Sequence, residues 1–128
     1  MSYGYKKQLG IPFAQAVERT KAALINEGFG ILTEIDVRDT LQKKLNIKYD
    51  NYIILGVCNP SLAYQALQLE KEIGLLLPCN VIVYEDDGKV FASAILPTSA
   101  MAIINRTDVT GIAIKVEEKL KKAINLLT

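Results

Sequence analysis

The sequence contains no histidine and no tryptophan, and it contains only two cysteines. Without histidine, the chain cannot form the Ser-His or Cys-His pairs that activate nucleophiles in many enzymes. It also cannot form a histidine-ligated zinc site, and two cysteines alone do not supply the four ligands of a structural zinc site within one chain. No recognised catalytic constellation remains, so the sequence favours a protein that is not an enzyme and points to no cofactor.

Neither charge nor hydrophobicity is strongly biased. The chain has 15 basic and 14 acidic residues, a formal net charge of +1, and its basic residues are spread out. This distribution lacks the basic patch of a protein that binds nucleic acid or an anionic membrane. The first residues lack the apolar run of a signal peptide, and no segment approaches the roughly 20 apolar residues that span a bilayer. We therefore expect a cytoplasmic protein with reduced cysteines.

Half of the 128 residues are hydrophobic, which suits a single domain over residues 1–128. Hydrophobic periodicity predicts strands at 2–8, 29–36, 52–58, 80–86 and 89–96. It predicts helices at 12–28, 37–45, 60–73 and 109–127, with a short helix after Pro97. In the second strand, strict alternation would place Phe29, Ile31, Thr33 and Ile35 on one face.

One turn decides how the last two strands pair. Asp87-Gly88 is a two-residue hairpin signal, so residues 80–86 and 89–96 must run antiparallel, with Tyr84 opposite Phe91. The simplest arrangement is an α+β fold, in which helices pack on one face of a mainly antiparallel sheet.

Two short motifs hold both cysteines: Cys58-Asn59-Pro60 and Leu77-Pro78-Cys79-Asn80. Each cysteine lies at a strand edge and is followed by asparagine, and the two motifs bracket the predicted helix 60–73. Asn59 suits the N-cap of that helix and Pro60 suits its first turn.

These motifs, with Gly56-Val57 before the first and the segment from Gly74 to Glu85 around the second, resemble the domain-of-unknown-function 302 family of bacterial and archaeal proteins. The resemblance runs from the first helix through Pro97. It implies a TATA-binding-protein-like fold of outline β-α-β(4)-α, here with an extra helix inserted between the third and fourth strands. It also implies a homodimer, but it implies no activity.

The strand arrangement decides whether the two thiols meet. A right-handed parallel crossover would place Cys58 and Cys79 at opposite ends of the sheet. An antiparallel step from strand 51–58 to strand 80–86 places them at the same end. The fold implied by the resemblance favours the antiparallel step, so we expect the thiols to be neighbours.

Three interpretations of this region are open. The cysteines are small core residues, which is common. Alternatively, they form a dithiol that binds a soft metal such as Cu(I) or cycles with a disulfide, because Cys58 precedes a helix N-terminus that favours a thiolate. In the third, Asn59, Ser61 and Asn80 form a small-ligand or anion pocket at that N-terminus.

The favoured hypothesis is a small homodimeric binding module without a nucleic-acid or membrane partner. Its candidate ligand-binding residues are Cys58, Asn59, Ser61, Cys79 and Asn80, with Cys58 and Cys79 as the only metal candidates. One alternative is a thiol-dependent enzyme that uses Cys79 or Cys58 as its nucleophile. Another is an interaction protein without a small-molecule site, whose seam uses sheet edges and the apolar residues near Met101 and Ile104.

Overall fold

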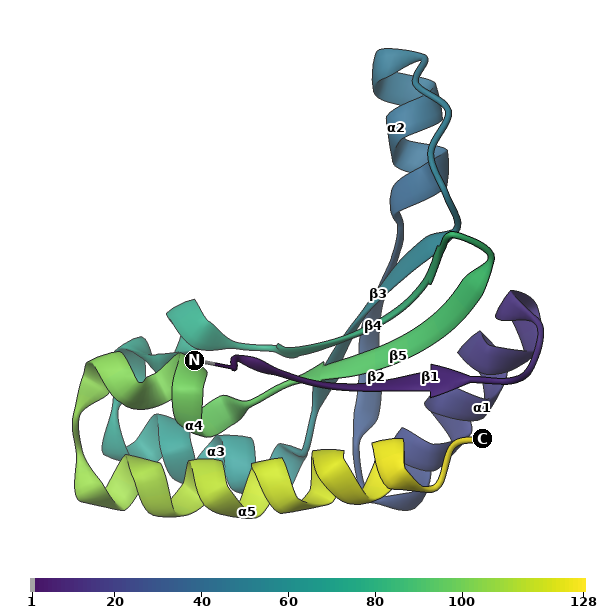
Figure 1. Ribbon diagram of the computed structural model, residues 1–128. Coiled ribbons are helices and arrows are strands. Elements are labelled where there is room, and N and C mark those ends of the chain that lie inside the picture. The colour runs from purple at the N-terminus through teal and green to yellow at the C-terminus, as the bar shows by residue number, and fades with distance from the viewer. Residues whose placement is uncertain (1) are drawn as a thin grey trace.

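The computed structural model describes residues 2–128 and confirms the predicted α+β class (Figure 1). Its strands are β1 (Gly4–Leu9), β2 (Gly30–Asp36), β3 (Tyr52–Cys58), β4 (Cys79–Asp86) and β5 (Lys89–Ile95). Its α-helices are α1 (Phe13–Asn26), α2 (Val37–Leu45), α3 (Pro60–Leu69), α4 (Pro97–Ala100) and α5 (Thr107–Asn125). Two 3-10 segments, η1 (Lys71–Leu76) and η2 (Met101–Ile104), follow α3 and α4.

The five strands form one antiparallel sheet in the order β1-β5-β4-β3-β2. The predicted hairpin is present: Asp87 (φ 53°) and Gly88 (φ 75°) both adopt left-handed backbone conformations, as a type I′ turn requires. Tyr84 lies opposite Phe91, as expected. β3 and β4 also pair antiparallel, which confirms the step that brings the two cysteine motifs to the same end of the sheet.

The two faces of the sheet differ in what covers them. Along β3, Ile53, Leu55 and Val57 are buried toward the helices, and the intervening residues point the other way. Helices α1, α3 and α5 lie together on that side of the sheet (Figure 1). No described helix is layered on the opposite side, which we call the open face.

The core consists of two clusters that α5 connects. The larger lies between the sheet, α1 and the C-terminal half of α5, around Leu24, Leu55 and Leu120. The smaller lies between α3, η1 and the N-terminal half of α5, around Ile73 and Val109. The apolar side of the predicted last helix thus contributes to both clusters.

The alternation predicted for the second strand is wrong. A register shift lies between Ile31, which opposes Val57, and Thr33, which opposes Gly56. Because the extra residue of a bulge reverses the alternation, Thr33 lies on the open face while Ile31 stays on the helix side. Glu34 therefore faces the helices, where it forms an ion pair with Lys21 of α1.

The helix predicted for residues 60–73 ends earlier, at Leu69. Glu70 is extended (φ −147°, ψ 103°), and its Oε2 accepts a hydrogen bond from Glu72 N at 3.2 Å, which starts the 3-10 segment η1. Arg106 Nη1 donates to Leu69 O at 2.6 Å and satisfies a carbonyl of the last turn. Gly74, the residue after the predicted helix, lies within η1.

Helix α2 does not join the helical layer. It projects from the ends of β2 and β3, away from α1, α3 and α5 (Figure 1). Asp36 caps it by accepting a hydrogen bond from Asp39 N at 2.9 Å, and Asn46 ends it in a left-handed conformation. None of its side chains is buried. We call residues 37–50 the α2 arm.

Candidate functional site

The antiparallel pairing places Val57 opposite Cys79, so both cysteine motifs lie at one end of the sheet. Cys58 and Cys79 border the same small apolar cavity of about 30 Å³, between the sheet, α3 and α5. Both thiols are free. The structure therefore places the two cysteines at the same end of the sheet and beside the same cavity, with Cys79 buried on the helix side and Cys58, the last residue of β3, only partly buried.

The environment of the thiols is apolar. Cys79 is 8% exposed, and burial raises its pKa to about 11, with a smaller contribution from the nearby Cys58. Burial also raises the pKa of Cys58, which is less deeply placed. Both shifts disfavour the thiolate, the form that acts as nucleophile and metal ligand.

Asn80 lies apart from the other candidates. Successive residues of a strand point to opposite faces, and Cys79 is buried toward the helices, so Asn80 points to the open face. Asn80 is exposed there, beside a separate pocket of about 310 Å³. The anion pocket predicted from Asn59, Ser61 and Asn80 therefore does not form with all three residues.

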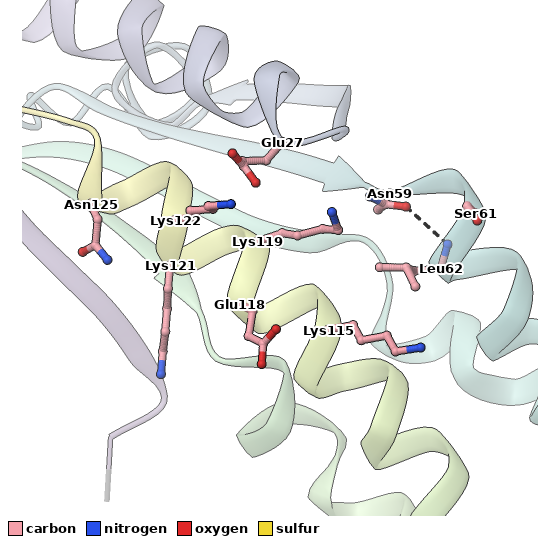
Figure 2. A pocket seen from close by; sticks show the side chains of 10 residues that line it. All are labelled: Glu27, Asn59, Ser61, Leu62, Lys115, Glu118, Lys119, Lys121, Lys122 and Asn125. Carbon is pink, nitrogen blue, oxygen red and sulfur yellow. Dashed lines mark hydrogen bonds between the residues drawn. The ribbon is translucent and has the colours of Figure 1, made fainter.

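Asn59 and Ser61 do border a larger cleft of about 760 Å³, between the N-terminus of α3 and the side of α5 (Figure 2). Asn59 is the predicted N-cap, and its Oδ1 accepts a hydrogen bond from Leu62 N at 3.3 Å. Pro60 occupies the first turn, as predicted. Among the first three helical residues, Pro60 has no N–H and the N–H of Leu62 donates to the Asn59 side chain. The N–H of Ser61 is therefore the one left without a partner within the helix.

The opposite wall of the cleft is a lysine stripe on α5, made of Lys115, Lys119 and Lys122. Figure 2 shows Lys119 and Lys122 extending toward Asn59 and Glu27, with Lys115 farther along the same wall. None of these three ammonium groups has a carboxylate oxygen within 4 Å in the described part of the chain.

Two acidic residues and a fourth lysine complete the cleft. Glu27, which follows the last residue of α1, points into it, whereas Glu118 and Lys121 extend in another direction (Figure 2). Lys121 forms an ion pair with Glu117, four residues earlier, at 3.7 Å, whereas Glu118 and Lys122, at the same spacing, form none among residues 2–128. Four lysines against two glutamates leave the lining with a net positive charge.

The lysine stripe was not predicted from the sequence. Spacings of four and three residues do place Lys115, Lys119 and Lys122 on one helix face. That pattern normally marks a solvated face, and only the packing of α5 beside α3 turns it toward a helix N-terminus. The missing signal was long-range contact, because α3 and α5 are far apart in the sequence.

Two further features bear on metals and membranes. In the described part of the chain, no group of three or more histidine, cysteine, aspartate or glutamate residues is arranged to hold a metal ion. No helix within residues 2–128 is long and apolar enough to cross a bilayer.

Comparison with known proteins tests the resemblance of the cysteine motifs. The model of the family described as "Domain of unknown function DUF302" matches residues 5–127. The chain belongs to this DUF302 family. Its fold is also similar to that of an uncharacterized conserved DUF302 protein from Bacillus stearothermophilus, solved by crystallography. The two are 27% identical over 100% of both chains, with a TM-score of 0.94.

No curated protein matches this DUF302 chain. The family description and the solved relative name neither a ligand nor a reaction. What the chain binds must therefore be argued from the cleft and the charges around it.

Proposed function

We propose that the protein is a cytoplasmic, non-enzymatic binding module that holds a small anion, such as a phosphate or carboxylate group, in the cleft between α3 and the lysine stripe. The observation that carries this proposal is the stripe itself. Three ammonium groups with no carboxylate oxygen within 4 Å in the described part of the chain face the positive end of a helix across a cleft of about 760 Å³.

The chemistry of the two walls is complementary to an anion. The N-terminus of a ten-residue helix such as α3 carries a partial positive charge and unsatisfied N–H groups. The backbone N–H and hydroxyl of Ser61 offer directional hydrogen bonds, while the lysines offer charge on flexible stems. Glu27 would repel a highly charged anion on one side, which favours a small ligand bound near Ser61 and Lys119.

The two thiol hypotheses have weaker support. A thiol-dependent enzyme needs a lowered thiol pKa, and burial raises that of both Cys58 and Cys79. A soft-metal site needs thiolates and is disfavoured by the same burial. The free thiols do suit the reducing compartment in which we place the protein.

The test is a titration with inorganic phosphate and with succinate, followed by the amide NMR signals of Ser61 and Leu62. We expect saturable shifts at these amides for at least one of the two anions. Lys119→Gln/Lys122→Gln should weaken binding at least tenfold, because each exposed charge contributes on the order of 1 kcal/mol to binding a small anion.

The matched control is Lys71→Gln/Lys89→Gln, which removes the same charge from two exposed lysines outside the cleft. The control should bind as the wild type does. If neither anion shifts these amides at millimolar concentration, or if both double variants lose affinity equally, the cleft is not the binding site.

A further inference from the structure

A small apolar cavity adjoins the cleft. It is the cavity of about 30 Å³ between the sheet, α3 and α5 that the two cysteines border. Asn59 and Leu62 line both this cavity and the cleft, so the two spaces lie next to each other at the first turn of α3. In Figure 2 the side chain of Leu62 extends from α3 toward α5. We call the smaller space the apolar cavity.

The apolar cavity lies where the two core clusters border each other. Its walls include Val57 and Cys79 of the larger cluster and Met101 of the smaller one. The surfaces that α3 and α5 turn toward it carry short side chains, those of Ala63, Ala66 and Ala113. Protein interiors are close-packed and hold few voids larger than a water molecule. A space of this kind directly beside a cleft therefore suits one end of a ligand.

The lining of the apolar cavity suits an alkyl group better than water. Among the described residues that line it, Asn59 at the rim is the only one with an amide or charged side chain. Cys58 and Cys79 act there as small hydrophobes. Apolar cavities in proteins stay dry and bind apolar ligands. Because a water molecule occupies roughly 30 Å³ in the liquid, the cavity has room for one group of about that size, such as a methyl.

We propose that the anion held in the cleft is a short-chain monocarboxylate whose alkyl group occupies the apolar cavity. Its carboxylate accepts a hydrogen bond from the N–H of Ser61 and lies near Lys119. Its chain passes Asn59 and Leu62 into the cavity. This inference rests on the proposed anion site, because the cavity alone offers no charged group that would orient a ligand.

The charges around the two spaces favour a single negative charge on the ligand. The lysine stripe attracts an anion, whereas the carboxylate of Glu27, which points into the cleft, repels it. A phosphate monoester carries about 1.5 to 2 negative charges at pH 7 and meets more of this repulsion than a carboxylate does. A dicarboxylate such as succinate would place its second charge in the apolar cavity, where burial of an unpaired charge is costly.

Met101 makes the far wall of the apolar cavity adaptable. The sequence predicted this residue near an interaction seam, but it is 8% exposed and lines the cavity instead. Its unbranched side chain has three rotatable bonds and fits itself to irregular gaps. A chain slightly longer than the cavity as it stands is therefore accommodated by a rotamer change of Met101, without movement of the backbone.

The experiment is a titration with acetate, propionate, butyrate, pentanoate, hexanoate and octanoate, followed by NMR. The amide of Ser61 reports on the carboxylate, and the methyl groups of Ala66 and Ala113 report on the alkyl chain. We expect the affinity to rise about three- to fourfold with each methylene that enters the cavity. It should be highest between propionate and pentanoate and lower for octanoate, because the cavity is then full.

Two substitutions should change this dependence on chain length in opposite ways. Ala63→Leu fills the cavity from a half-buried position on α3, so longer chains should no longer bind more tightly than acetate. Leu62→Ala enlarges the space between cavity and cleft and should shift the best ligand toward longer chains. Circular dichroism checks that both variants fold.

The matched control is Leu67→Ala, the same substitution on the same helix at a residue that is 40% exposed and lines neither space. This variant should keep the wild-type order of affinities. If it changes that order as Leu62→Ala does, the effect comes from the stability of α3 and the inference is overturned.

The remaining outcomes separate this inference from the proposed anion site. Equal affinity for acetate and pentanoate at Ser61 overturns the inference and leaves the anion site in place. So does a chain-length dependence that Ala63→Leu leaves unchanged, since the chain would then lie outside the cavity. If phosphate shifts Ser61 and no carboxylate does, the inference again fails alone. Methyl shifts at Ala66 and Ala113 without any shift at Ser61 contradict both proposals.

Discussion

At the scale of single residues, burial changes the chemistry of Cys79. Its pKa in the folded protein is about 11, above the ordinary value of 9.0. Between pH 9 and pH 11 the Cys79 thiol keeps its proton in the folded chain but has lost it in the unfolded chain. The contribution of this thiol to the free energy of unfolding is therefore fully present below pH 9 and is lost as the pH rises toward 11. The difference corresponds to roughly 2–3 kcal/mol. We expect the free energy of unfolding in urea to fall with pH over this range, and to fall less steeply in Cys79→Ala.

Cys58→Ala is the control, because Cys58 is less buried and its raised pKa should contribute less. This variant should keep most of the wild-type slope. Parallel slopes for the wild type and Cys79→Ala would contradict the prediction. They would point to other groups that titrate in this range, such as Tyr52, whose pKa is also raised by burial.

Single residues also show how far the candidate site could be predicted. The meeting of Cys58 and Cys79 followed from antiparallel pairing, and the structure confirms that pairing. The separation of Asn80 also followed from the sequence, since neighbours in a strand point to opposite faces, but the prediction grouped it with Asn59. The lysine stripe could not be predicted, because nothing local to residues 115–122 indicates that α3 lies across from it.

At the scale of one element, two glycines should respond oppositely to the same substitution. Gly111 is exposed within α5, and a Cβ added there meets nothing within 4 Å. Since glycine costs about 1 kcal/mol relative to alanine inside a helix, Gly111→Ala should raise the free energy of unfolding by about that amount. Urea denaturation measures the change.

Gly28 provides the opposite case. Gly28 lies in the turn after α1 with a φ of +87°, and an added Cβ would lie 3.2 Å from Asn59 Nδ2. Gly28→Ala should therefore lower the free energy of unfolding by roughly 1–2 kcal/mol. A destabilising Gly111→Ala would instead mean that the side of α5 near residue 111 contacts something, such as a partner, that one chain does not show.

The elements also show where periodicity fails. The hairpin turn and the long final helix have strong local signals, and the structure confirms both. The bulge in β2 has none, because Ile31 and Thr33 alternate normally in the sequence and only pairing with β3 reveals the extra residue. The end of α3 was missed for a related reason. Leu69 and Ile73 continue a helical spacing, while the break at Glu70 depends on a hydrogen bond from Glu72 N to the Glu70 carboxylate and on one from distant Arg106 to Leu69 O.

At the scale of the whole molecule, one sheet face is covered by helices and the other is not. On the open face the rings of Tyr52, Tyr84 and Phe91 stack in a row, and none of the side chains of α2 is buried. If the chain forms the homodimer that the family resemblance implies, association is linked to folding, because partners that bind only the folded chain stabilise it by mass action. The apparent stability of the protein should then depend on its concentration.

This linkage gives a test that needs no assumption about the ligand. A hundredfold increase in protein concentration should raise the wild-type melting temperature by roughly 3–6 °C, from about 1.4 kcal/mol per chain. Ile82→Lys, whose new charge lies at the centre of the open face, should melt at a temperature independent of concentration. Ile103→Lys should follow the wild type, because its charge is on η2 at the other side of the molecule. Equal concentration dependence in all three proteins would mean that the open face is not where the copies associate.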